Sequence, residues 1–169
     1  MIELELVGVR VEFPANQPIV LLKEKAGTRY LPIWIGAVEA TAIAFALQGV
    51  NTPRPLTHDL FKTVLQALDA ELTAVHITEL RDGTFYAELH LTRDGEKLSI
   101  SARPSDAVAL AARFENIPIL SAEDVLDSAG IELDGDEGLQ ADDREDDEDQ
   151  LREFREFLDE ISPDDFRGQ

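Results

Sequence analysis

Apolar and polar residues alternate through the first 35 residues in the pattern of three strands. In residues 2–13 the apolar positions of the alternation are Ile2, Leu4, Leu6, Val9, Val11 and Phe13. The alternation slips by one residue at Val7–Gly8, where a one-residue β-bulge is therefore expected. Two further strands, residues 19–23 and 29–35, complete a predicted antiparallel three-stranded meander.

The helix predicted next, residues 37–47, is apolar almost all round. Between Ala37 and Leu47 the only polar side chains are those of Glu39 and Thr41. A helix that is apolar on every side is expected to be buried. An ionisable group in such a helix is costly unless another group pairs with it. Glu39 is therefore the first candidate functional residue.

The second half of the chain repeats this order of elements after an extra helix. Thr57 is the expected N-cap of that helix, which runs to about residue 69. Its apolar stripe is expected to pack on one side and consists of Leu60, Phe61, Val64, Leu65 and Leu68. Asp82–Gly83 and Asp94–Gly95 are typical type I′ hairpin turns. They predict a second meander of residues 72–81, 84–93 and 96–102.

A small-residue helix is predicted from Pro104 to about Glu115, followed by a short strand at 117–120 and a short helix to about Asp127. The fold class is therefore α+β. It contains two antiparallel three-stranded meanders, each followed by a buried small-residue helix. An extra helix lies between the two halves, and a helix follows in the C-terminal tail.

The two halves also resemble each other in sequence. With an offset of 67 residues, Leu31–Leu47 aligns with Leu98–Phe114, and Glu39 falls on Asp106. Shared alanines and a common strand-to-helix pattern explain the likeness as well as a duplication does, so both explanations stay open. A duplication would place two carboxylates in equivalent first turns, facing each other.

Charge divides the chain into a body and a tail. The net charge is −20, and residues 134–169 hold 16 Asp/Glu against 4 Lys/Arg. We expect a domain at residues 1–133, an acidic disordered linker at 134–149, and a short amphipathic helix and tail at 150–169. The apolar residues of that helix are Leu151, Phe154, Phe157, Leu158 and Ile161. The helix is suited to dock on the body, on a second copy or on a protein partner.

Composition excludes several functions. The chain has no cysteine, which excludes disulfides, thiolate catalysis and thiolate metal sites. An acidic body argues against simple binding of a nucleic-acid backbone. No signal peptide, lipidation motif or membrane-spanning apolar run is present, so a cytoplasmic protein without a membrane partner is expected.

Three polar clusters coincide with predicted helix starts, where free backbone N–H groups favour anions. The first is Glu39, the second is Arg54, Thr57, His58 and Asp59, and the third is Arg103, Ser105 and Asp106. A purely structural interpretation is available for each: Thr57 and Ser105 as caps, Asp59 and Asp106 as partners of the helix dipole, and Arg54 or Arg103 as the counter-ion of Glu39. His76 and His90 are expected on a half-exposed sheet face.

Four runs of sequence resemble a known family. They are Leu31-Pro-Ile-Trp-Ile-Gly with Glu39-Ala40, Pro53-Arg-Pro-Leu-Thr-His-Asp59, Asp82-Gly-Thr-Phe-Tyr86 and Ala102-Arg-Pro-Ser-Asp-Ala107. In this order they resemble the bifunctional nuclease family over residues 1 to about 130. The resemblance implies an α+β fold, a homodimer or higher homo-oligomer, and hydrolysis of both DNA and RNA. It supplies no catalytic residues.

Two functions of different classes follow. The leading hypothesis is a metal-assisted nuclease that acts on nucleic acid. In it, Glu39 and Asp106 hold Mg²⁺ or Mn²⁺, and Asp59 and His58 complete the catalytic group. Arg54 and Arg103 clamp phosphate oxygens, with Thr57 and Ser105 as further substrate contacts. The alternative is a non-catalytic dimeric binding or regulatory module in which the same clusters are structural salt bridges.

Overall fold

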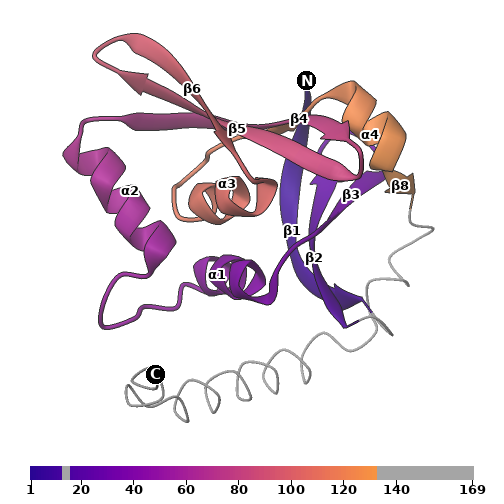
Figure 1. Cartoon of the computed structure of the whole chain (residues 1–169), viewed down its shortest axis with the longest axis horizontal. Coiled ribbons are helices and arrows are strands. Elements are labelled where there is room, and N and C mark those ends of the chain that lie inside the picture. Colours follow the sequence, from indigo (N-terminus) through magenta and orange to yellow (C-terminus); the bar gives the residue numbers. More distant parts are fainter. Residues whose placement is uncertain (13–15, 133–169) are drawn as a thin grey trace, which may run out of the picture. The chain divides into compact units, whose positions relative to one another are not determined.

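The computed structural model describes residues 1–12 and 16–132, which form eight strands and four helices (Figure 1). The strands are β1 (Ile2–Glu12), β2 (Gln17–Glu24), β3 (Arg29–Trp34), β4 (Glu71–Arg81), β5 (Thr84–Arg93), β6 (Glu96–Ala102), β7 (Ile119–Ser121) and β8 (Ile131–Glu132). The helices are α1 (Ala37–Leu47), α2 (Thr57–Ala67), α3 (Pro104–Ala111) and α4 (Glu123–Ala129). The predictions for Phe13, for the linker 134–149 and for the tail helix at 150–169 lie outside the described residues.

All eight strands belong to one mixed sheet in the order β6-β5-β4-β7-β1-β2-β3-β8. Consecutive strands β1–β2–β3 and β4–β5–β6 pair antiparallel, and the parallel pair β4–β7 joins the two halves. The α+β class is thus confirmed. The predicted short strand is β7, which lies between β4 and β1, and β8, which was not predicted, adds a strand beside β3. No helix among the described residues has the length and apolar character needed to cross a membrane.

Local signals in the sequence account for the irregular points of the sheet. The register between β1 and β2 shifts between Leu6 and Gly8, which confirms the predicted bulge. Both hairpin turns have two consecutive residues of positive φ, with values of 50° and 74° at Asp82–Gly83 and 51° and 81° at Asp94–Gly95. This is the type I′ geometry that matches the twist of the flanking strands.

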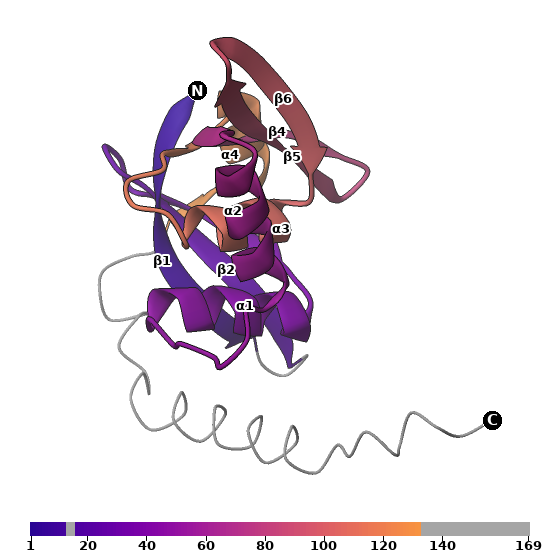
Figure 2. The same cartoon turned by 90° about the vertical axis from the view of Figure 1, so that its left-hand side faces the viewer.

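Helix α3 is the centre of the packing. Seven of its eight residues are buried, as predicted for this small-residue helix. It contacts α1, α2, β4 and β5. Three of the seven buried residues are alanines, Ala107, Ala109 and Ala111, and their small side chains let these neighbours approach closely. In Figure 2, α2 lies at the front of the molecule, with α1 below it and α3 behind it.

Two predictions about burial are wrong. Helix α1 buries only Ala40, Ile43 and Phe45, and Val38 is 76% exposed, because the sheet and α3 cover only part of its circumference. In α2 only Leu65 of the predicted stripe is buried. The other four members of that stripe are Leu60, Phe61, Val64 and Leu68, and all are exposed.

Candidate functional site

The N-terminal ends of three helices meet, and each end contributes a polar side chain. Glu39 lies in the first turn of α1 and His58 in the first turn of α2. Arg103 is the residue before α3, and Asp106 lies in the first turn of that helix. We call these four residues the three-helix cluster. Contacts between them bring together members of all three clusters identified in the sequence.

One guanidinium links the two carboxylates of the three-helix cluster. Arg103 NH1 lies 2.9 Å from Glu39 Oε1. Arg103 Nε donates to Asp106 Oδ2 at 2.7 Å, and NH2 donates to Asp106 Oδ1 at 3.0 Å. This is a bidentate geometry, the strongest form of an arginine–carboxylate pair. Arg103, and not Arg54, is therefore the counter-ion of the half-buried Glu39.

His58 completes the three-helix cluster. Its Nε2 lies 3.2 Å from Asp106 Oδ1, and its side chain is only 13% exposed. Partial burial by itself would raise the pKa of Asp106, but the hydrogen bonds from Arg103 and His58 outweigh it, so that pKa lies below its usual value. The hydrogen bond to Asp106 raises the pKa of Arg103. Asp106 is thus held as a carboxylate at neutral pH.

The backbone at the start of α1 also shapes the cluster. Gly36 is the N-cap residue of α1 and has an ordinary φ of −77°. A Cβ atom built at this position would overlap the carboxylate of Glu39. The absence of a side chain at Gly36 therefore gives the Glu39 carboxylate the room to fold back over the helix end.

A second ion pair lies beside the three-helix cluster and fastens α2 to the end of α3. Arg113 Nε donates to Asp59 Oδ1 at 2.5 Å, and Arg113 NH1 donates to the Ala109 carbonyl oxygen at 2.7 Å. Lys62 Nζ donates to the Arg113 carbonyl oxygen. Partial burial opposes ionisation of Asp59, but Arg113 and the Leu56 N–H lower its pKa below the usual value.

Asp59 therefore belongs to a different ion pair from Glu39 and Asp106. Sequence reasoning missed Arg113 and Lys62. A signal for Arg113 was available: like Glu39, it is a charged residue that borders a segment of small apolar residues, Ala107–Ala112.

The remaining predicted site residues are not joined to the three-helix cluster by side-chain contacts among the described residues. Arg54 and Thr57 are exposed, and no ion pair of the Arg54 guanidinium occurs in the described part of the chain. Ser105 is buried within α3. Neither hydroxyl residue is an N-cap. Leu56 occupies the N-cap position of α2, and its apolar side chain makes no capping hydrogen bond. The Asp59 carboxylate instead accepts a hydrogen bond from the Leu56 N–H at 2.9 Å. Arg103 precedes α3.

The two other histidines are half-buried in the sheet and contact each other. The rings of His76 on β4 and His90 on β5 have centroids 3.8 Å apart. Burial lowers the pKa of His76, and the neighbouring His90 lowers it further. They pack as sheet side chains, apart from the three helix N-termini.

The donor groups do not fit the predicted divalent cation in this arrangement. Within residues 1–12 and 16–132, no three or more His, Asp or Glu side chains are placed to hold a metal ion together. Glu39 and Asp106 both direct their carboxylates at Arg103, so its guanidinium takes the position of a shared cation.

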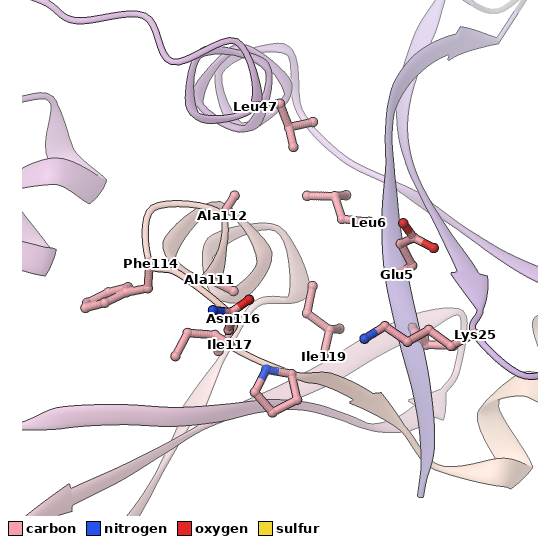
Figure 3. Close-up of a pocket in the computed structure, with 12 residues that line it drawn as sticks. Glu5, Leu6, Lys25, Leu47, Ala111, Ala112, Phe114, Asn116, Ile117 and Ile119 are labelled. Atoms are coloured by element: carbon pink, nitrogen blue, oxygen red, sulfur yellow. The ribbon is translucent and has the colours of Figure 1, made fainter.

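A pocket of about 300 Å³ lies at the opposite end of α3 (Figure 3). Its lining is mainly apolar and includes Leu6 of β1, Leu47 of α1, Ala111 at the end of α3, and Phe114 just after that helix. Lys25 extends its ammonium group toward it (Figure 3). None of the predicted site residues lines this pocket, so it is separate from the three-helix cluster.

Comparison with known proteins agrees with the four sequence runs. A family model described as the bifunctional nuclease domain matches residues 20–134. The chain belongs to the bifunctional nuclease domain family. All members of the three-helix cluster, and Asp59 with Arg113, lie within the matched range. These two ion-pair groups are therefore part of the bifunctional nuclease domain.

Of the relatives compared, one is an uncharacterized protein and two are named as nucleases. An uncharacterized protein of Mycobacterium tuberculosis is 50% identical over 168 residues, which are 98% of each chain. Bifunctional nuclease 1 of Oryza sativa subsp. japonica is 30% identical over 107 residues, 62% of this chain and 32% of that protein. Bifunctional nuclease 2 of the same rice is 28% identical over 128 residues, 73% of this chain and 39% of that protein. Both rice proteins are thus matched over less than half of their length.

Proposed function

We propose that the chain hydrolyses phosphodiester bonds of nucleic acid at the three-helix cluster. The observation that carries the proposal is the convergence of three helix N-termini on Arg103 and His58. Free N–H groups and the helix dipole at such ends favour a phosphate. The names of the plant relatives, bifunctional nucleases, support the same substrate class.

Arg103 has donors left for a phosphate after its two ion pairs are made. A guanidinium carries five N–H groups. One on Nε, one on NH1 and one on NH2 point to the two carboxylates, which leaves one N–H on each terminal nitrogen. The side chain is 65% exposed, so these two donors can meet a phosphate from solvent. Exposed Arg54, just before α2, would contact a neighbouring phosphate of the strand.

His58 is the candidate for proton transfer. If its Nε2 carries the proton, it donates to Asp106, and Nδ1 keeps a free lone pair. Nδ1 would accept a proton from water as the water oxygen attacks phosphorus and the bond to the leaving oxygen breaks. Asp106 positions the imidazole and stabilises its charged form. Glu39 holds Arg103 in place for the phosphate.

The test is cleavage of single-stranded RNA and double-stranded DNA by the full chain and its variants. His58→Asn and Asp106→Asn should each lower kcat by about 100-fold or more, the usual contribution of a general base. Arg93→Gln is the matched control, since Arg93 is exposed on the β5–β6 hairpin. Cleavage that is equal in all variants comes from a contaminant and contradicts the proposal. Thermal unfolding of each variant excludes loss of the fold.

The same assay addresses the divalent cation. A rate that is unchanged by chelation agrees with the donor arrangement described above. A strict requirement for Mg²⁺ or Mn²⁺ would mean that Arg103 leaves Glu39 and Asp106 before the reaction.

One observation favours the second candidate, a non-catalytic dimeric binding or regulatory module. Glu39, Asp59 and Asp106 are each held by an arginine, as in a structural clasp between helices. For this candidate, the purified chain would bind nucleic acid or protein without cleaving it. Asp106→Asn would lower the stability of the fold, and neither the wild type nor this variant would show nuclease activity.

A further inference from the structure

The pocket beside the C-terminal end of α3, which we call the α3-end pocket, has a buried apolar floor and an open mouth. Leu4, Ala111 and Ile119 form the floor, and their exposed fractions are 2%, 5% and 6%. Lys25 and Leu47 lie at the mouth, where the Lys25 side chain is 50% exposed and Leu47 is 47% exposed. A ligand in this pocket would therefore bury an apolar part on the floor and keep its other end near Lys25 and water.

The α3-end pocket has the size of a small molecule and not of a folded partner. Its volume is about 300 Å³. An apolar cavity of about 150 Å³ holds one benzene ring, so this pocket has room for about ten to twelve non-hydrogen atoms. The space is present because the residues at the end of α3 are small: Ala111 is the last residue of the helix, and Ala112 is its C-cap.

The helix ends beside the pocket do not require a cation from a ligand. Helices α1 and α3 both end at the pocket, and the free carbonyl groups of a helix C-terminus favour positive charge. Here most of these carbonyls already accept backbone hydrogen bonds, namely those of Ala44, Phe45 and Ala46 in α1 and of Val108, Leu110 and Ala111 in α3. The Ala109 carbonyl oxygen accepts a hydrogen bond from the Arg113 guanidinium at 2.7 Å. A positively charged ligand would thus find few free acceptors at these two helix ends.

Lys25 is the charged side chain that points into the pocket. Among the described residues, the ionisable ones that line the pocket are Glu5 and Lys25. In Figure 3 the ammonium group of Lys25 is directed at the pocket, whereas the Glu5 carboxylate lies against β1 and points away from it.

The ammonium group of Lys25 keeps donors for a ligand. Its Nζ donates to Glu3 Oε1 at 2.6 Å, and this hydrogen bond raises the pKa of Lys25, which is therefore charged at neutral pH. An ammonium group has three N–H donors, so two are left after the bond to Glu3. A carboxylate is the acceptor that suits them best, because a hydrogen bond between two charged groups is stronger than one between neutral groups.

We propose that the α3-end pocket binds a small amphipathic carboxylate, an aliphatic acid of about eight carbon atoms. Its carboxylate accepts hydrogen bonds from Lys25 Nζ at the mouth, and its chain lies on the floor between the ends of α1 and α3. Glu3 competes for the same ammonium group, so the buried chain supplies most of the affinity. The dissociation constant should then be about 0.1–1 mM. The proposal does not depend on the nuclease function, since no member of the three-helix cluster lines this pocket.

Titration of the ¹⁵N-labelled full chain with sodium octanoate, followed by NMR, tests the place of binding. The chemical shifts should saturate with a dissociation constant below about 1 mM. The largest changes should occur at backbone amides around the pocket, such as those of Lys25, Ala112 and Ile119. The amides of β6 are the internal control and should not shift, because no residue of that strand lines the pocket.

A substitution that fills the pocket tests the apolar part of the ligand. Ala112→Leu should weaken octanoate binding about tenfold or more, because the larger side chain takes the place of the ligand chain. Ala112 has a φ of −61°, which leucine adopts without strain. Ala67→Leu is the matched control, since Ala67 is exposed at the end of α2, and it should leave the dissociation constant unchanged.

A comparison of head groups tests the role of Lys25. Lys25→Gln should weaken octanoate binding about fivefold and leave the binding of 1-octanol unchanged. Lys97→Gln, on exposed β6, is the matched control and should change neither. Octylamine should bind the wild type about fivefold more weakly than octanoate, because its head group meets the ammonium group of Lys25.

Four results would overturn the proposal. They are octanoate shifts that do not saturate or that lie away from the pocket, an unchanged affinity in Ala112→Leu, an equal effect of Lys25→Gln on octanoate and 1-octanol, and tighter binding of octylamine than of octanoate. Far-UV circular dichroism of each variant excludes loss of the fold as the cause of weaker binding.

Discussion

Arg113 is the charged side chain on which the packing of α2 against α3 most depends. Its side chain is only 6% exposed, and it joins two elements that the sequence separates by 54 positions. Nε binds the Asp59 carboxylate of α2, and NH1 binds the Ala109 carbonyl oxygen near the C-terminal end of α3. Replacement by methionine keeps most of the aliphatic volume but removes both bonds. We predict that Arg113→Met lowers the free energy of unfolding by about 2–3 kcal/mol.

The size of this loss in the free energy of unfolding depends on the groups that lose their partner when Arg113 is replaced. A hydrogen bond from a charged group contributes about 1.5–3 kcal/mol. The Asp59 carboxylate is 38% exposed and keeps the Leu56 N–H, so water can replace part of the lost interaction and its share lies at the lower end. The Ala109 carbonyl is at the helix end, where Arg113 is its hydrogen-bond donor. Without that donor, it becomes a poorly solvated acceptor, which costs about 1–3 kcal/mol.

Urea and thermal unfolding at pH 7, followed by far-UV circular dichroism, measure this effect. At this chain length a loss of 2–3 kcal/mol lowers Tm by about 4–12 °C. Arg113→Lys keeps the charge without the fork of donors and should lie between the wild type and Arg113→Met. Arg93→Met is the control, since Arg93 is half exposed and its pair with Asp94 is at the surface. Its effect should stay below about 0.5 kcal/mol. A loss below about 1 kcal/mol for Arg113→Met, or an equal loss in the control, would refute this account.

Three further predictions concern the three-helix cluster and its neighbour Asp59. In a double-mutant cycle of Arg103→Gln and Glu39→Gln, unfolding should show a favourable coupling of about 0.5–1 kcal/mol, because Arg103 is largely exposed; additive effects would contradict the pair. The pKa values of Asp106 and Asp59 are lowered in the folded chain, so their contribution to stability is present above about pH 4 and disappears as the pH falls toward the folded values. Asp106→Asn should therefore make the free energy of unfolding fall less steeply below pH 4. The change in slope should correspond to the uptake of at most one proton, as measured by urea unfolding from pH 2 to 7. Gly36→Ala should displace the Glu39 carboxylate without straining the backbone. Cleavage or phosphate binding should then fall, while Tm changes by less than about 3 °C. An unchanged Arg103–Glu39 coupling in this variant would show that Gly36 does not position the Glu39 carboxylate.

Several parts of the molecule could be predicted because their causes are local. The type I′ turns depend on Asp–Gly pairs, and the bulge in β1 depends on a slip in alternation at Gly8. The three polar clusters could be found because ionisable residues beside apolar helices are costly without a partner. The offset of 67 residues also matched Glu39 with Asp106, and the structure places both on one guanidinium.

Other parts required the packing of distant segments. A sequence pattern identifies an apolar stripe but not what covers it, and so the predicted packing of α2 was wrong for four of its five members. The partner of Glu39 could equally have been Arg54, which is close to it in sequence. The actual partner is Arg103, because α3 and not the connector before α2 is packed against α1.

The sequence by itself determined most of the strands, turns and helices, and which charged groups need partners, because those properties depend on side chains within a few positions of each other; it missed β8, and the helix predicted to run to about Glu115 ends at Ala111. Only the tertiary structure decided that three helix N-termini meet, that Asp59 joins Arg113 and not the three-helix cluster, and that most of the apolar stripe of α2 stays exposed. These outcomes depend on how the buried α3 fits between α1, α2 and the sheet. That fit depends on contacts over tens of residues, which no local pattern specifies.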